Sequence, residues 1–216
     1  MKKLLLTLFC LSGLQVALAQ VQFNPKIGAS FLKLSGSTAN FKNTTETVET
    51  DFSADLGIMA GADVRIGHEF LFTPGIFFAR NTTITKFKGD SLYTGNELED
   101  NLIRSSLKLR TMVGYKIINQ KNLKLLANVG PSYDFILSVD NSDDKIDFEE
   151  NDFNGGSFNL DASVGLDIWF LTAEVGYSYG LTEAFSKDSD FQLEFDSKFN
   201  TLYITLGIVF GKGVKE

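Results

Sequence analysis

The chain has 216 residues, a formal net charge of −7 and hydrophobic side chains at 44% of its positions. An acidic chain of this kind argues against nucleic acid as a partner and against a basic patch that binds a membrane surface. After the first 19 residues the sequence contains no run of about 18 apolar residues, which excludes a membrane-spanning helix there.

The N-terminus has the features of a secretory signal peptide. Two lysines precede the apolar run 4–11, which is too short for a membrane anchor, and Ala17 and Ala19 form an A-x-A cleavage site. We therefore expect residues 1–19 to be removed, leaving one domain over 20–216 with a net charge of −9 once those lysines are lost. Cys10 is the only cysteine, so the mature domain is expected to have no disulfides.

Apolar residues recur with a period of two along the rest of the chain. In 52–66 every even position is apolar, while serine, aspartate, glycine and arginine occupy most odd positions. This alternation is typical of a β-strand with one apolar and one polar face. Pro74 and Pro131 predict local bulges or breaks in two of the strands. The expected strands are 24–35, 52–66, 69–84, 101–117, 122–138, 156–168, 170–182 and 198–210.

The connections between these segments alternate in length. Short links are expected at 67–68, at 118–121 and around Trp169, and long polar loops at 36–51, 85–100, 139–155 and 183–197. Outer-membrane β-barrels have short periplasmic turns and longer extracellular loops. The sequence therefore predicts an all-β fold, an eight-stranded antiparallel up-and-down transmembrane β-barrel with both termini on the periplasmic side.

Aromatic residues cluster near the ends of the expected strands. One set lies toward the short turns: Phe70, Phe72, Tyr115, Trp169, Phe170 and Phe210. The other lies toward the long loops: Phe52, Tyr133, Phe135, Phe158, Tyr177 and Tyr179. Two such girdles are expected where a barrel meets the membrane interfaces. The alternative for these residues is the aromatic core of a soluble sandwich. For the whole chain, a further alternative is a soluble, lipocalin-type barrel, in which the apolar face points inward around a ligand.

The polar face carries charges of both signs, and in a membrane barrel it fills the interior. An eight-stranded barrel is just wide enough for its own side chains, and an unpaired buried charge is costly. We therefore predict an ionic network that plugs the barrel, with a narrow porin-like channel for small solutes or protons as the alternative. The predicted interior residues are Lys26, Asp63, Arg65, Glu69, Arg104, Lys108, Arg110, Lys116, Lys124, Asp134, Asp161, Asp167 and Glu174.

Residue counts from the short turns divide this network into layers. Arg110 and Asp161 are expected at mid-height, with Arg104 and Lys108 above them near Asp134. The layer nearest the short turns is expected to contain Asp63, Lys116, Lys124, Asp167 and Glu174.

The long loops are acidic, most of all 139–155. Its carboxylates are Asp140, Asp143, Asp144, Asp147, Glu149, Glu150 and Asp152. Calcium accepts such oxygen ligands, but an EF-hand loop needs glycine at its sixth position, where this run has Lys145. A solvated loop is therefore favoured over a metal site, and the extracellular loops are expected to contact a protein or a surface polysaccharide.

The sequence gives little support for catalysis. His68 is the only histidine and lies in a short turn, far from the outer loops and without a neighbouring nucleophile such as Ser105 or Ser132. The sequence also contains no histidine and cysteine cluster for a metal and no glycine-rich phosphate loop. We expect no enzymatic activity and no cofactor.

Several motifs of the mature chain carry a family resemblance. They are Gln20 after the A-x-A site, PKIG at 25–28, GIMAG at 57–61, PGI at 74–76, the run 123–131 and YITLGIVF at 203–210. These resemble the porin-like, PorT-like family of outer-membrane β-barrel domains over nearly the whole mature chain. The resemblance implies a barrel surrounded by outer-membrane lipid in a Gram-negative bacterium, and it implies no particular activity.

The closing strand is also similar to the signal that the barrel-assembly machinery reads. Gly207 and the aromatic Phe210 fit that signal, whereas the extension 211–216 departs from it. The resemblance therefore implies this machinery as a partner during biogenesis.

Overall fold

The computed structural model is a closed antiparallel β-barrel with eight wall strands. It describes residues 20–35, 38–41, 47–88, 98–141, 155–182, 193–195 and 198–211. The predicted signal peptide 1–19, with its cleavage site, lies outside the described residues. The wall strands are β1 (Val21–Ser35), β4 (Leu56–Gly67), β5 (Phe70–Lys88), β6 (Leu98–Asn119), β7 (Leu123–Asn141), β8 (Gly156–Ile168), β9 (Leu171–Gly180) and β11 (Lys198–Ile208).

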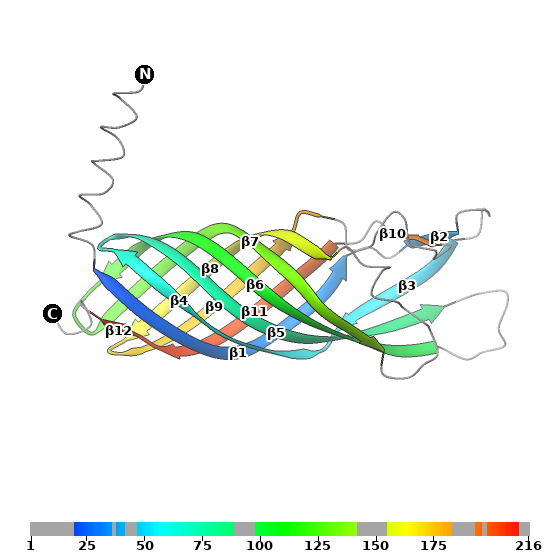
Figure 1. The fold of residues 1–216 in the computed structure, drawn as a ribbon, viewed down its shortest axis with the longest axis horizontal. Helices are drawn as coiled ribbons and strands as arrows, with labels where there is room; N and C mark the ends of the chain where they lie inside the picture. Colours follow the sequence, from blue (N-terminus) through cyan, green and yellow to red (C-terminus); the bar gives the residue numbers. More distant parts are fainter. Residues whose placement is uncertain are drawn as a thin grey trace, which may run out of the picture.

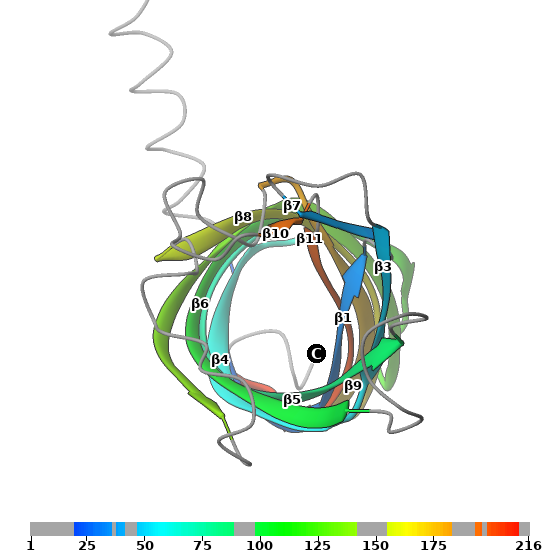
Figure 2. The same ribbon diagram turned by 90° about the vertical axis from the view of Figure 1, so that its right-hand side faces the viewer.

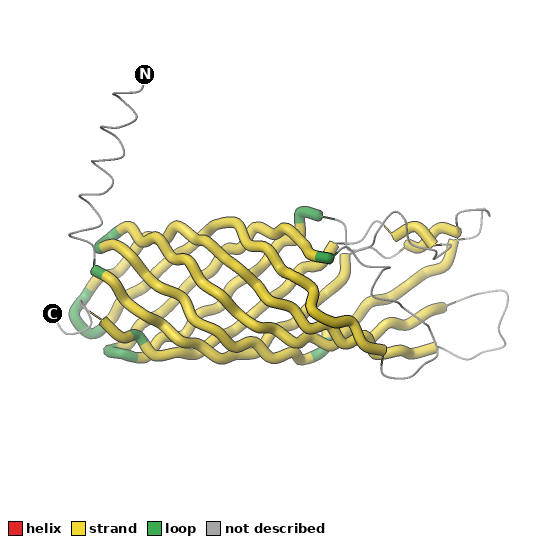
Figure 3. The backbone as a smooth tube through the Cα atoms, in the orientation of Figure 1, coloured by secondary structure: helices red, strands yellow, loops and turns green. Residues whose placement is uncertain are grey.

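Each wall strand pairs with the next one along the chain, as the up-and-down prediction requires (Figure 1). The barrel closes where β1 pairs with β11, in a register that runs from Lys26 opposite Gly207 to Ser35 opposite Lys198. Figure 2 shows the closed ring of strands from the long-loop end. The short turns after β4, β6 and β8 lie together at the other end, where β1 also begins (Figure 3).

The strands reach further into the expected long loops than the alternation predicts. β5 continues to Lys88 and β6 begins at Leu98, so both strands occupy parts of 85–100. The remaining short strands are β2 (Thr38–Phe41), β3 (Thr47–Ala54), β10 (Leu193–Phe195) and β12 (Phe210–Gly211). β3 and β4 together form the predicted second strand, which is interrupted at Asp55. In Figure 1, β2, β3 and β10 project beyond the long-loop end of the barrel.

The prolines within the strands break the backbone pairing on one side, and the register continues across each break. At Pro74 the β4–β5 pairing stops at Asp63 opposite Gly75 and resumes at Ile66 opposite Phe72. A similar break between β6 and β7 faces Pro131. The bulges of the β6–β7 pair lie elsewhere, at Ser105/Ser106 and Lys116/Ile118, because proline removes one hydrogen bond and does not insert a residue.

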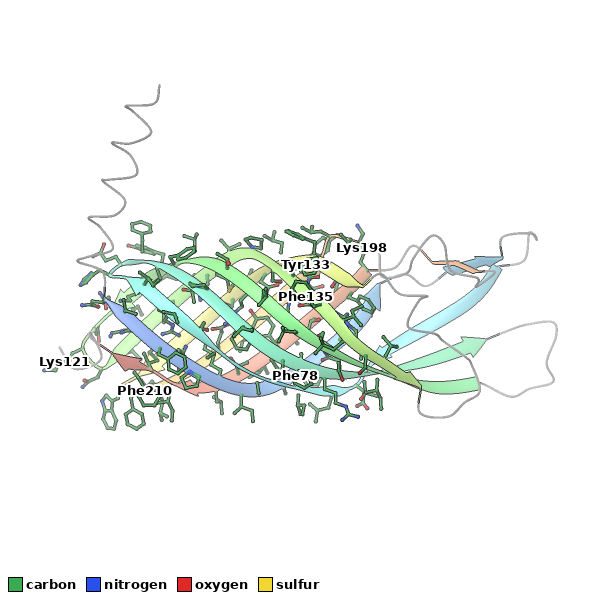
Figure 4. The ribbon with its side chains drawn as sticks, in the orientation of Figure 1. Phe78, Lys121, Tyr133, Phe135, Lys198 and Phe210 are labelled. Atoms are coloured by element: carbon green, nitrogen blue, oxygen red, sulfur yellow. The ribbon has the colours of Figure 1, made fainter. Side chains whose placement is uncertain are left out.

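The apolar face of the strands points outward and the polar face inward. Ile27, Leu206 and Ile58 are each more than 60% exposed, whereas Asp63 and Asp161 are fully buried. Figure 4 shows the aromatic side chains of Phe78, Tyr133, Phe135 and Phe210 on the outside of the barrel. This is the reverse of a lipocalin-type barrel, and the soluble alternative is therefore wrong. No helix in the described part of the chain is long and apolar enough to cross a membrane.

The aromatic side chains form contacts near both ends of the barrel. The rings of Phe70 and Tyr115 lie 5.0 Å apart beside the short turns. Toward the long loops, Tyr133 contacts Phe135 and Phe158, with ring centroids 4.6 and 5.9 Å apart. The predicted girdles are present among the described side chains, which do not include that of Phe52.

The single tryptophan provides a test of where the short-turn end lies in a membrane. Trp169 occupies the two-residue turn after β8 with a φ of 57° and is 64% exposed. Tryptophan prefers the membrane–water interface, so its fluorescence should be quenched more strongly by lipids brominated near the headgroup than at the chain end. The Trp169→Phe variant gives the background signal. Stronger quenching by lipids brominated at the end of the acyl chain would contradict this placement.

Candidate functional site

The barrel interior contains the concentration of charge that the sequence predicts. The buried charged side chains are Lys26, Asp63, Arg65, Arg104, Lys108, Arg110, Lys116, Asp134, Asp161, Asp167 and Glu174. Lys124 is half-buried near the short-turn end of β7. Glu69 is exposed, and its prediction as an interior residue is wrong. β4 extends to Gly67 and β5 begins at Phe70, which moves the predicted 67–68 turn by one residue and places Glu69 within it.

Two basic and two acidic side chains form what we call the central cluster: Lys26, Asp63, Arg110 and Glu174. Arg110 donates to Asp63 Oδ2 at 2.8 Å and to Glu174 Oε1 at 2.9 Å. Lys26 Nζ also contacts both carboxylates, with 2.7 Å to Asp63 Oδ2. The charges of the central cluster balance, and each charge has two partners of opposite sign within the cluster. Asp63 Oδ1 also lies 3.9 Å from Nε of Arg65.

The central cluster crosses the barrel interior. Arg110 extends from β6, and its Nη1 also donates to the hydroxyl of Tyr203 on β11 at 3.2 Å. β6 and β11 are four strands apart in either direction around the eight-stranded ring, so they face each other across the interior. The guanidinium of Arg110 also lies 4.3 Å from the ring centre of Phe77. Charged and aromatic side chains therefore occupy the middle of the barrel.

Small residues make room for these long side chains. Gly75 lies between Asp63 and Arg110 in the paired strands, opposite Asp63 on one side and Arg110 on the other. A Cβ atom at Gly75 would lie 3.0 Å from both the Cβ of Asp63 and the ring of Phe77. A Cβ at Gly207 would lie 2.7 Å from Cγ of Lys26. Glycine at these positions lets the ion pairs form across an intervening strand.

A second group, the loop-end cluster, consists of Arg104, Lys108, Asp134 and Asp161. Lys108 Nζ lies 3.3 Å from Asp134 Oδ1 and 3.5 Å from Asp161 Oδ1. It also donates to the hydroxyls of Ser132 and Ser178, at 3.2 and 2.8 Å. Arg104 Nη2 lies 3.4 Å from Asp134 Oδ2, a longer contact than those of the central cluster.

Arg104 also reaches the opposite wall of the barrel. Its guanidinium lies 4.1 Å from the ring centre of Phe199 on β11, and both side chains are 2% exposed. The geometry fits a cation–π contact, which is strengthened when water is excluded. Arg104 and Phe199 therefore obstruct the interior beyond the loop-end side of the central cluster.

The third group, the turn-end cluster, is built on Arg65. Its Nη1 donates to Asp167 Oδ2 at 2.7 Å, and its Nη2 donates to Thr172 Oγ1 at 3.2 Å. Arg65 belongs to β4 and Asp167 to β8, which are also four strands apart around the ring. Buried Lys116 lies close enough to Asp167 and Lys124 for electrostatic interaction. Arginine side chains thus cross the interior at three levels.

The layers differ in part from those expected from residue counts. Arg110 pairs with Asp63 and Glu174, which were expected nearer the short turns, whereas Asp161 joins Lys108. Pairing around a barrel is staggered relative to the turns: Asp63 and Arg110 both lie opposite Gly75, although Arg110 is further from the short turn along its strand than Asp63. The expected proximity of Arg104 and Lys108 to Asp134 is observed, because Lys108 and Asp134 are paired directly across β6 and β7.

Several interior residues were missed because they are uncharged. Among the almost completely buried apolar or aromatic side chains are Leu32, Phe77, Met112, Leu126, Phe199 and Tyr203. The two-residue period along each strand could have predicted that these side chains point inward. Phe77 stands between Ile76 and Phe78, and its odd position places it with the polar face.

No group of three or more metal-binding side chains occurs in the described ranges. The acidic run of 139–155, the candidate calcium loop, lies almost entirely outside the described residues. His68 lies exposed in the turn after β4, whereas Ser132 is buried in the interior and hydrogen-bonds to Asp161 Oδ1 at 2.8 Å. The described residues therefore give no evidence for a catalytic site.

A closed eight-stranded barrel with an apolar outer face, aromatic girdles and a buried charged interior defines a transmembrane β-barrel of the outer-membrane type. Comparison with known families agrees with this class. The chain belongs to the family described as "Outer membrane protein beta-barrel domain", whose model matches residues 15–186. It is a protein of the bacterial outer membrane.

A solved structure shows the same fold. The chain is similar to the outer membrane protein OprG from Pseudomonas aeruginosa, with a TM-score of 0.56 and 12% identity, over 88% of this chain and 95% of OprG. Neisserial surface protein A gives a TM-score of 0.43 at 12% identity, over 87% and 97% of the two chains. Ail of Yersinia pestis, solved with the heparin analogue sucrose octasulfate, gives 0.41 at 11% identity, over 88% and 99%.

At 12% identity the likeness to OprG shows the fold alone. No curated protein sequence matches the chain significantly.

Proposed function

We propose that this protein is a structural or interaction barrel, closed by its interior network, that makes its contacts through the extracellular loops. The central cluster carries the proposal, since Arg110 joins β6 to residues of β4, β9 and β11 across the interior. Above it Arg104 and Phe199 meet across the interior, and below it Arg65 reaches Asp167. Buried salt bridges with several partners at successive levels favour a plugged interior over an open pore.

The loops supply the remaining part of the proposal. We propose that the acidic loops face the extracellular side and that their partner is a protein or a surface polysaccharide. We further propose that residues 1–19 are removed as a signal peptide and that the barrel-assembly machinery inserts the mature chain. Within its family, we propose that the chain is PorT-like. No catalytic role is proposed.

A narrow channel is the second candidate, and one observation favours it. Several buried polar atoms in the loop-end cluster have no hydrogen-bond partner: Nε and Nη1 of Arg104, and Oδ2 of Asp161. Buried polar groups are normally satisfied by protein or by ordered water, so water is expected to enter this part of the interior. A continuous chain of such water would conduct protons or small ions.

Planar bilayer recordings distinguish the two functions. We expect the intact barrel to show no discrete conductance steps. The Arg110→Ala variant should be less stable but should also show no conductance steps, because Arg104, Phe199 and Arg65 still cross the interior. Lys121→Ala, in an exposed short turn, is the control for a loss of charge outside the network. Conductance steps in the wild type that become larger in Arg110→Ala would overturn the proposal of a plugged interior and support a channel.

A further inference from the structure

The loop-end cluster contains buried hydrogen-bond donors that have no partner among the described residues. Nε and Nη1 of Arg104 form no hydrogen bond, although this side chain is only 2% exposed. The hydroxyl of Ser157, a residue that is 1% exposed, also has no partner. A buried polar group that is left unsatisfied is costly, and more so when it carries a charge. These donors therefore indicate a ligand that accepts hydrogen bonds.

The residues around these donors lie at the long-loop ends of their strands. Arg104 precedes Lys108 on β6, Ser157 is the second residue of β8, and Phe199 is the second residue of β11. All three strands run from the long-loop end toward the short-turn end (Figure 1). A solute that enters from the long-loop end would therefore reach Arg104 before it reached the central cluster.

The ionic contact of Arg104 is long and shared. Its Nη2 lies 3.4 Å from Asp134 Oδ2, while Lys108 Nζ lies 3.3 Å from Oδ1 of the same carboxylate. Lys108 has a second carboxylate partner in Asp161 and donates to two serine hydroxyls. Within the described interior, Arg104 has only the ring of Phe199 besides Asp134. Arg104 is therefore the cation of the loop-end cluster whose charge is less well compensated.

The aromatic contact leaves the donors of Arg104 available. The guanidinium carbon lies over the Phe199 ring, 4.1 Å from its centre. A guanidinium group is planar and its N–H groups point outward in that plane, so a ring packed over the group does not satisfy them. Arginine side chains with open N–H groups bind oxyanions through charge-assisted hydrogen bonds.

The surrounding charges indicate which oxyanion fits. The two cations and two acids of the loop-end cluster balance, so a monoanion adds less uncompensated charge to this buried space than a dianion such as phosphate. The cluster also has an open acceptor, Oδ2 of Asp161. It lies further from the long loops, because Asp161 is paired with Gly130 and Ser157 with Asp134. A carboxylate is a monoanion with two acceptor oxygens, and it matches the donors of Arg104 and Ser157.

We propose that the loop-end cluster binds a small carboxylate, which accepts hydrogen bonds from Arg104 and Ser157 and replaces Asp134 as the anion beside Arg104. The site requires access only from the long-loop end, so the proposal goes beyond the plug and holds whether or not the interior conducts. The competing occupant is water, which would satisfy the same donors without a preference for an anion.

The test uses the full mature barrel in phosphatidylcholine nanodiscs at neutral pH, with acetate as the carboxylate. The Nε–Hε cross-peak of Arg104 in a nitrogen–proton correlation spectrum is assigned by its absence in Arg104→Lys. This peak should shift with added acetate and reach saturation. Acetamide, a neutral molecule of similar shape, and sodium chloride at equal ionic strength should leave the peak unchanged.

Two variants test the neighbours that the proposal names. Asp134→Asn removes the acid that competes for Arg104, so acetate should bind at least about threefold more tightly. Ser157→Ala removes one hydrogen bond to the ligand, so acetate should bind about fivefold more weakly. The matched control is Asp55→Asn, the same change at an exposed position before β4, which should leave acetate binding unchanged. Heat-modifiable gel migration verifies that each variant is folded.

An equal shift of the Arg104 peak with acetamide or with sodium chloride would overturn the proposal, since the site would then hold water or respond to ionic strength alone. Wild-type affinity for acetate in either Asp134→Asn or Ser157→Ala would overturn it as well. So would an equal gain in affinity in Asp55→Asn, because the effect of Asp134 would then be one of overall charge.

Discussion

Replacement of Asp63 by asparagine is expected to destabilise the barrel by about 3 kcal/mol, because it leaves the buried cations Lys26 and Arg110 with one carboxylate between them. Asp63 is 1% exposed and accepts hydrogen bonds from Lys26, Arg110 and Asn24. After the substitution, Lys26 and Arg110 share Glu174 as their remaining carboxylate partner. The free energy of unfolding, measured by urea titration in lipid vesicles with Trp169 fluorescence as the signal, reports the loss.

The matched control is Asp55→Asn, the same change at an exposed position just before β4, where about 0.5 kcal/mol or less is expected. A second variant separates charge balance from packing. Adding Lys26→Met to Asp63→Asn leaves Arg110 paired with Glu174, so the double variant should be less destabilised than the sum of the two single variants. Additive losses, or equal losses at Asp55 and Asp63, would refute an energetically coupled central cluster.

Replacement of Gly176 by alanine should destabilise the barrel by about 1–3 kcal/mol through overpacking. A Cβ atom at this inward position of β9 would lie 2.2 Å from Cζ of Tyr203, which is 1% exposed. The ring would have to move, and with it the hydroxyl that accepts a hydrogen bond from Arg110. The urea midpoint should fall, and the near-ultraviolet circular dichroism of the tyrosines should change.

Gly165 is the control, because it also faces inward, on the adjacent strand β8. A Cβ atom there would approach no described atom closer than 3.8 Å, so Gly165→Ala should be neutral or slightly stabilising. Similar losses at both glycines would show that the barrel rejects any added interior methyl group. In that case the close packing of Tyr203 on Gly176 would not explain the effect.

These expectations follow from how the interior is assembled. Each arginine that crosses the barrel is held by a different set of neighbours: carboxylates for Arg110, a carboxylate and a hydroxyl for Arg65, and an aromatic ring with one long ionic contact for Arg104. Among the described residues, Arg104 has two guanidinium nitrogens without a hydrogen-bond partner, Nε and Nη1, whereas Arg110 has one, Nε. The loop-end level is therefore the place where the plug is weakest.

The alternation of side chains was sufficient to predict the wall strands. In 156–168 the observed strand β8 has the predicted limits, because every residue of that segment follows the two-residue period. Elsewhere the prediction fell short at strand ends. β5 and β6 continue past the apolar belt into polar sequence, since pairing of a neighbouring strand supports backbone hydrogen bonds there without an apolar face.

The burial of the interior charges also followed from the alternation, because inward and outward positions differ by one residue. Glu69 is the exception, since the turn after β4 takes it out of the ladder before its side chain can face inward. The ion-pair partners could not be read from the sequence. Arg65 and Asp167 are 102 residues apart and meet only because β4 and β8 lie on opposite walls of a narrow barrel.

The sequence by itself determined that this protein is a barrel with an apolar exterior, a charged interior and long loops at one end, because these features depend on local period and loop length. The tertiary structure decided which charges pair and which aromatic rings obstruct the interior. Those contacts depend on strand tilt and on the register of β1 against β11, which join the two ends of the chain and have no signature in any single segment.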